Sequence, residues 1–162
     1  MEVRFVGPEG KEVIQIDGAT IIFRNFQGRG DKFNREGDRN FAVRIYDEEL
    51  ADILAAKGWN VKVKPPKEEG DDPFMYLPVK VKFNNRGPSI YLKTGDNINR
   101  LNEGSIGILD DIDIAEVDLD VRPYDWEMSD GKSGRTAYLQ SIHVTQEIDR
   151  FAARYTDEDE EY

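Results

Sequence analysis

The sequence predicts a mainly β domain, a small barrel with one short helix. Three observations support this prediction: short alternating or β-branched segments recur along the chain, turn residues separate them, and only one stretch has helical periodicity. A chain of 162 residues is long enough to bury a core of its own. We expect one domain over residues 1–155, followed by a disordered acidic tail at 156–162.

The predicted strands follow one another along the chain, separated by turns. Asp17-Gly18 lies between two β-branched segments and predicts a tight turn. Residues 84–87 predict a second turn, after which a strand returns, and residues 95–107 resemble a loop. The alternation changes phase near Ala115-Glu116, which indicates a β-bulge. The predicted strands cover residues 12–16, 19–23, 40–46, 59–64, 75–83, 89–93 and 112–121, with 120–126 and 135–145 forming a hairpin around residues 130–134.

One helix is predicted, over residues 47–57. Asp47 can cap it, Glu48 and Glu49 suit its positive first turn, and Gly58 ends it. Many short strands with a single helix between the middle ones favour an OB-fold-like barrel with five strands and long insertions. A β-sandwich is the alternative.

The composition excludes several kinds of site. Without cysteine the chain has no disulfide, thiolate metal site or cysteine nucleophile, and a single histidine, His143, excludes a His-rich zinc site. We expect no cofactor. No apolar run approaches the roughly 20 residues of a membrane helix, and residues 1–10 do not resemble a signal peptide. We therefore expect a cytoplasmic protein with no membrane partner.

The segment Phe23–Arg44 is the strongest functional signal. It has six basic and three acidic residues within a chain of net charge −11. Cations interleaved with aromatic rings can hold a phosphate backbone while bases lie on the rings, and the glycines at 28 and 30 would let backbone approach a ligand. The alternative is a solvated loop whose phenylalanines enter the core. The candidate nucleic-acid-binding residues here are Arg24, Phe26, Arg29, Lys32, Phe33, Arg35 and Arg39, and alternating strand positions add Lys62, Lys64, Tyr76, Lys80, Lys82 and Tyr91.

Two acidic regions together hold as many carboxylates as the net negative charge of the chain. Residues 110–120 carry six carboxylates, which could hold Mg²⁺ if they converged. Along one strand, however, such side chains lie about 6–7 Å apart, so a solvated strand face is the favoured interpretation. The tail cannot fold alone, because its acids repel one another and bury nothing. Apart from solubility, it could compete with DNA for a cationic groove and bind partner proteins through Asp157, Glu158, Asp159, Glu160, Glu161 and Tyr162.

Several stretches resemble a family of bacteriophage proteins: IIFRNFQGRGDKFNREGDRNFAVRI, GWNVKVKPP, YLPVKVKF, DIDIAEVDLDVRPYDWE and SGRTAYLQSIHVTQE. The resemblance covers residues 22–154 and implies a single-stranded DNA-binding protein of OB-fold type. The closing DEDEEY is similar to the acidic tails of bacterial and phage single-strand binders. Those tails recruit replication and recombination enzymes, which implies the same role here, in the cytoplasm of the host.

We therefore expect a non-enzymatic, largely sequence-independent protein that coats single-stranded DNA in replication or recombination. One alternative is a metal-dependent nuclease or resolvase that uses the carboxylates of Asp110–Asp120. Another is a DNA mimic or host-modulating phage protein that presents those acids. A homo-oligomer is compatible with the sequence, which does not fix the oligomeric state.

Overall fold

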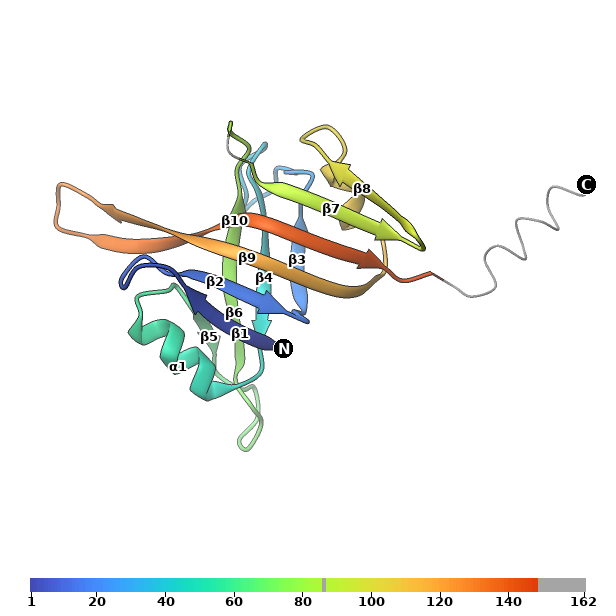
Figure 1. The fold of residues 1–162 in the computed structure, drawn as a ribbon. Coiled ribbons are helices and arrows are strands. Elements are labelled where there is room, and N and C mark those ends of the chain that lie inside the picture. The colour runs from blue at the N-terminus through green and yellow to red at the C-terminus, as the bar shows by residue number, and fades with distance from the viewer. Residues whose placement is uncertain (86, 149–162) are drawn as a thin grey trace, which may run out of the picture.

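The computed structural model describes residues 1–85 and 87–148 (Figure 1). The predicted acidic tail lies outside these residues. Within them the protein is mainly β, as predicted, with one α-helix and one short 3-10 helix, η1. The elements are β1 (Glu2–Val6), β2 (Val13–Asp17), β3 (Ile21–Asn25), β4 (Arg39–Ile45), α1 (Glu48–Ala56), β5 (Lys62–Lys64), β6 (Phe74–Val81), β7 (Ser89–Thr94), β8 (Asn97–Leu101), η1 (Ile106–Asp110), β9 (Ile114–Glu127) and β10 (Ser133–Gln146).

The strands pair in the order β1-β2-β9-β10-β6-β4-β3. β2 pairs with β9 and β3 pairs with β4, yet only residues 18–20 separate β2 from β3. Hydrogen bonds continue through this link, because Ala19 N donates to Val117 O and Arg44 N donates to Thr20 O, each at 2.8 Å. The curled sheet therefore returns on itself through one bent segment, as expected for an OB-fold-like barrel.

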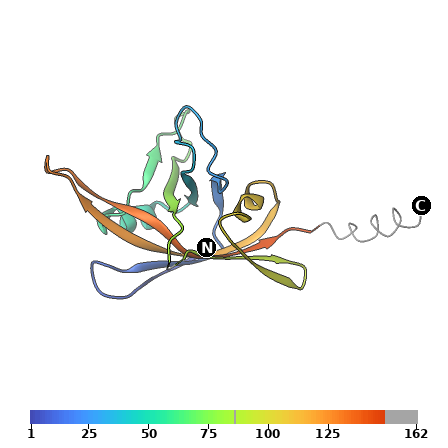
Figure 2. The same ribbon diagram turned by 90° about the horizontal axis from the view of Figure 1, so that it is seen from above.

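The parallel pairing of β6 with β10 joins the two halves of this sheet. Ala137 pairs with Val79 and Tyr138 with Lys80. Because this ladder makes one continuous sheet, the β-sandwich alternative does not describe the fold. β3, β4 and β6 run across the direction of β9 and β10 (Figure 1). The turn end of the β9–β10 hairpin, residues 124–136, called here the arm, and the β7–β8 hairpin extend to opposite sides of the body (Figure 2).

Features predicted from short-range patterns are confirmed. Glu49 N donates to the Asp47 carboxylate at 2.9 Å, so Asp47 caps α1, and Gly58 has a positive φ of 95° just beyond the helix. β9 and β10 form the predicted hairpin. Thr145 pairs with Glu116 and Gln146 with Ile114, so the intervening Ala115 forms the predicted bulge.

Features that depend on long-range pairing were predicted less well. The prediction that a tight turn at Asp17-Gly18 joins two paired strands is wrong, because β2 pairs with β1 and β9 whereas β3 pairs with β4. β6 and β7 do not pair with each other either: both lie parallel to β10, one beyond the other. Residues 95–107 contain β8 and the start of η1 rather than a loop alone, and β1 was not predicted.

The core lies between β1, β2 and β9 on one side and β4 and β6 on the other, with α1 covering one end. Ile14, Val43 and Leu77 are almost completely buried, and Leu54 of α1 faces the same interior. The buried apolar residues, with the exception of Ala42, form one contiguous cluster. No helix within residues 1–85 and 87–148 has the length and apolarity needed to cross a membrane.

Candidate nucleic-acid interface

A groove of about 650 Å³ opens between the loop that precedes β4, the end of β6 and the base of the arm. We call it the cationic groove. Four of the predicted cations lie along it, together with three aromatic rings and only two carboxylates. Its lining consists of Phe33, Asn34, Arg35, Gly37, Asp38, Arg39, Asn40, Lys80, Val81, Lys82, Phe83, Glu103 and Tyr138.

Side-chain hydrogen bonds hold the loop that carries Phe33. The Asp31 carboxylate accepts from Phe33 N and Asn34 N, both at 2.7 Å. The Asn34 amide in turn donates to the main-chain carbonyls of Arg29, Arg35 and Asp38. Phe33 remains 93% exposed, so its ring projects from a preformed loop. An exposed ring on a fixed backbone can stack on a base with little loss of conformational entropy.

The glycines of this loop have a structural role. Gly37 N donates to Gly28 O at 2.8 Å, which brings the two legs of the loop together. A Cβ added at Gly30 would lie 2.9 Å from the Cβ of Glu36, and Gly28 has a φ of 73°. The missing side chains therefore allow the loop to close on itself.

A row of residues that pair across neighbouring strands crosses the outer face of the sheet at the groove. Asn40 pairs with Lys80, Lys80 with Tyr138, and Tyr138 with Arg122. The Arg122 guanidinium lies 5.0 Å from the centre of the Tyr138 ring, and exposed Tyr124 contacts that ring edge-on at 5.8 Å. Alternation could have placed Tyr138 on this face, but only the pairing of β6 with β10 brings it beside Lys80.

Two further groove residues were missed from the sequence. The Arg39 guanidinium lies 5.7 Å from the centre of the Phe83 ring and 3.4 Å from the Glu103 carboxylate. Phe83 follows the end of β6, and Glu103 lies between β8 and η1. The sequence interval between Phe83 and Arg39 gave no signal that they would meet.

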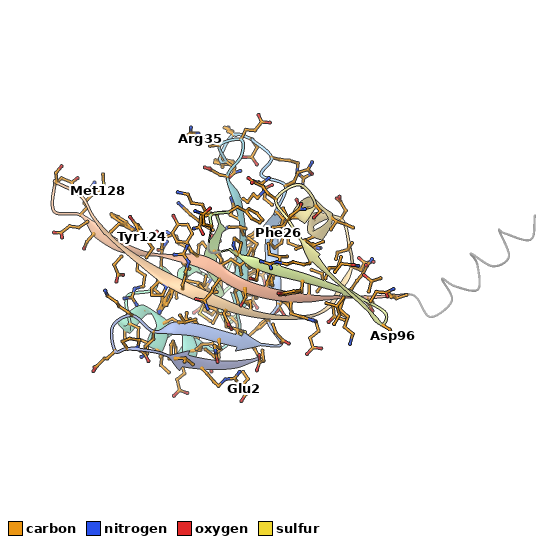
Figure 3. All side chains as sticks on the ribbon, turned by 45° about the horizontal axis from the view of Figure 1, so that its top comes forward. Glu2, Phe26, Arg35, Asp96, Tyr124 and Met128 are labelled. Carbon is orange, nitrogen blue, oxygen red and sulfur yellow. The ribbon has the colours of Figure 1, made fainter. Side chains whose placement is uncertain are left out.

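Phe26 and Arg24 stabilise the fold and do not line the groove. Phe26 has no exposed surface and stacks on Phe41 at 5.0 Å, so the prediction that it stacks on a base is wrong. Arg24 Nη1 donates to the carbonyls of Leu109 and Ile112 at 2.7 and 2.8 Å. These bonds hold η1 and its C-terminal end against β3. Figure 3 shows Phe26 within the body and Arg35 at the outer end of the loop.

Asp110 also acts structurally. Its side chain is only 1% exposed and accepts from Phe26 N at 2.8 Å and Gln27 N at 3.0 Å. Arg29, another predicted ligand of DNA, lies 3.8 Å from the same carboxylate and outside the groove lining. Among residues 1–85 and 87–148, no group of three or more acids or histidines is arranged to hold a metal ion.

The remaining predicted residues divide among three places. Lys32 is exposed beside Phe33, with its Nζ 5.9 Å from the ring centre. Lys62, Lys64 and Tyr76 lie together on β5 and β6, beyond the groove. Tyr91 is on β7, paired with residues of β8 and β10, and does not reach the groove.

Arg135 anchors the arm to the body near the end of α1. Its guanidinium donates to the Asp125 carboxylate at 2.7 and 3.0 Å and to the carbonyls of Gly10 and Lys57 at 2.6 and 3.1 Å. The hydrogen bond between them lowers the pKa of Asp125 and raises the pKa of Arg135. The arm therefore leaves the body in a fixed direction, with Tyr124 along it and Met128 near its tip (Figure 3).

The solved structures similar to this chain include three of phage single-stranded DNA-binding proteins, two of them of the same protein. The protein from bacteriophage Enc34 has a TM-score of 0.53 at 10% identity, covering 94% of both chains. Its C-terminal truncation has a TM-score of 0.47 at 11% identity, covering 91% of this chain and 97% of that one. Bacteriophage T7 gp2.5 has a TM-score of 0.43 at 7% identity, covering 91% and 94%. The first of these similarities supports the fold.

Sequence comparison identifies the family. A search of curated proteins finds no significant match. The family model described as "Putative phage ssDNA-binding domain" matches residues 8–161, nearly the whole length. This protein therefore belongs to the phage ssDNA-binding domain family.

Proposed function

We propose that this protein is a non-enzymatic phage protein that binds single-stranded DNA in the cationic groove, largely independently of sequence. One observation carries the proposal: Arg35, Arg39, Lys80 and Lys82 line one groove with Phe33, Phe83 and Tyr138. These residues come from separate segments, so their convergence is a property of the fold and not of local composition. Membership of the phage ssDNA-binding domain family supports the same ligand.

The cations and the rings have different tasks. Arg35, Lys80 and Lys82 contact phosphates, whose charge is the same for every sequence. Phe33 and Tyr138 stack on bases, and each base has a ring face to offer. Stacking requires bases that are free of their partners, so single strands bind better than duplex. A chain of net charge −11 can bind a polyanion in this way, because the local electrostatic field at the groove, and not the net charge, determines whether phosphates bind there.

The test is a salt series with a dT oligonucleotide, duplex DNA and RNA of the same length. Affinity should be highest for a single strand and should fall steeply as salt rises, because bound phosphates no longer gain from counterion release. Incubation with Mg²⁺ should leave the DNA uncut. Duplex binding that equals or exceeds single-strand binding, or no binding at low salt, would refute the proposal.

Two further parts of the proposal concern the acidic tail and the role of the protein in the host cell. We propose that the protein coats single strands during replication or recombination in the host cytoplasm. The tail residues Asp157–Tyr162 would compete with DNA for the groove and recruit replication or recombination proteins. Deletion of residues 156–162 should strengthen single-strand binding, most at low salt where screening is weakest, and abolish partner capture. Unchanged affinity at every salt concentration would leave only the partner role.

A further inference from the structure

A second surface of rings and cations lies on the outer face of the sheet, beyond the cationic groove. Its cations make no salt bridge with any carboxylate of the described residues. We call it the aromatic platform. It consists of the rings of Phe23, Tyr46, Phe74 and Tyr76 and the cations Arg44, Lys62 and Lys64.

Phe23, which belongs to this surface, has an unusual backbone conformation. Its φ is 53°, and it is the one described residue other than glycine with a positive φ. The pairing of β3 with β4 is irregular between Ile22 and Asn25, so Phe23 lies in a bulge. Its ring is 56% exposed and meets Tyr76 edge-on at 5.3 Å. Such strain in a bulky, exposed residue is more typical of a binding site than of a packing requirement.

The cations are held among the rings. The Arg44 guanidinium lies 3.9 Å from the centre of the Phe74 ring and 4.8 Å from that of Tyr46, which is 66% exposed. Arg44 Nε is buried and has no hydrogen-bond partner among the described residues. Lys64 Nζ lies 5.9 Å from the centres of both the Phe23 and Tyr76 rings. Cations next to exposed ring faces can bind phosphates while the rings bind bases.

The platform and the groove share one face of one sheet. Arg44 pairs with Tyr76 and Asn40 pairs with Lys80, so the two pairs lie four positions apart along β4 and β6. Four strand residues span about 13 Å. On β4 and β6, only Ala42 and Pro78, which pair with each other, lie between them on this face. A chain lying in the groove can therefore continue to the platform without crossing a charged side chain of these two strands.

We propose that single-stranded DNA bound in the cationic groove continues onto the aromatic platform, where bases stack on Phe23 and Tyr76. This inference rests on the proposed function and extends its site. The 13 Å separation corresponds to about four stacked nucleotides. Short strands should therefore occupy the groove alone, and longer strands should gain affinity from the platform.

The test compares dT oligonucleotides of about 4 and about 16 nucleotides, the range of site sizes known for OB folds. The double variant Phe23→Ala/Lys64→Gln should bind the long strand about tenfold more weakly and the short strand less than about twofold more weakly. The charge-only variant Lys62→Gln/Lys64→Gln alters two exposed side chains and should fold normally. It should reduce the salt slope for the long strand by about 1.4 and leave the slope for the short strand unchanged.

The matched control is Lys11→Gln/Lys132→Gln, which removes the same charge from exposed residues outside both surfaces. With this control, the salt slope for either strand length should change by much less than the value of about 1.4 expected for the platform variant. Equal losses for both lengths in the platform variants, or no loss for either, would overturn the inference while leaving the groove proposal intact. So would a change in oligomeric state without a change in affinity, since the platform would then bind a second copy of the chain. Failure of the parent protein to bind either length would refute the proposed function itself.

Discussion

Phe26 and Phe33 lie in the same basic segment, seven residues apart, and have opposite roles in the structure. Phe26 has no exposed surface and stacks on Phe41 in the core. Phe33 is 93% exposed at the edge of the cationic groove. Arg24 and Arg35 show the same contrast, because Arg24 binds two main-chain carbonyls whereas Arg35 lines the groove.

The difference divides the segment into a structural half and a half that we propose binds DNA, called here the binding half. Residues 24–29 include the end of β3 and its exit turn, which Asp110 of η1 holds through two backbone amides. Residues 31–39 form a loop that is held largely by its own side chains, among them Asp31 and Asn34. Both halves carry phenylalanine and arginine, although the three acidic residues of the segment all lie in the binding half. What separates them is whether another element of the fold lies against the side chain.

The largest expected effect follows from removing the buried ring. Phe26→Ala should destabilise the protein by about 3–5 kcal/mol, because it removes apolar contacts and leaves a cavity beside Phe41. Urea denaturation with a spectroscopic probe measures this change. Phe33→Ala is the matched control, and its free energy of unfolding should change by less than about 0.5 kcal/mol. Equal losses of stability would remove the distinction between the two rings.

Asp110→Asn should have the next largest effect on stability, about 1.5–3 kcal/mol. The carboxylate accepts from Phe26 N and Gln27 N, and an amide can replace one oxygen acceptor but not both. Asp111→Asn, an exposed neighbour, is the control and should change stability little. If both variants unfold at the same urea concentration as the parent, Asp110 does not anchor the structural half.

The binding half is tested by Phe33→Ala in an oligonucleotide titration. Loss of one stacking ring should weaken single-strand binding by about 1–3 kcal/mol while the salt slope stays nearly constant. Exposed Ile98→Ala on β8 serves as the control, since it lies outside the groove lining. A binding defect that appears only when the protein also loses stability would mean that this ring, like Phe26, supports the fold.

The smallest effect distinguishes the two arginines. Arg35→Gln should lower the salt slope of single-strand binding by about 0.7, the value for one phosphate contact, without loss of stability. Arg24→Gln should lower stability, because the carbonyls of Leu109 and Ile112 lose their donor, and should leave the slope unchanged. If Arg24→Gln instead lowers the salt slope and Arg35→Gln lowers stability, then Arg24 contacts DNA and Arg35 supports the fold.

The sequence by itself determined the features that depend on neighbouring residues. The cap at Asp47, the bulge at Ala115, the β9–β10 hairpin and the mainly β class follow from local hydrogen-bonding and alternation rules. Five of the seven cations and rings of the candidate site were also predictable, since Phe33, Arg35, Arg39, Lys80 and Lys82 are recognisable as cations and rings near turns or on alternating strands.

Only the tertiary structure decided which of those residues meet. The groove exists because β6 pairs in parallel with β10, which brings Tyr138 beside Lys80 across 58 positions of sequence. The backbone of Phe26 is held likewise by a distant residue, because its amide donates to Asp110 of η1, 84 positions away. Neither contact leaves a periodic trace in the chain, because pairing between distant strands is set by the packing of the whole core. A local pattern can therefore identify a residue whose type suits a binding surface, but the fold decides whether that residue is exposed at the surface or stabilises the core.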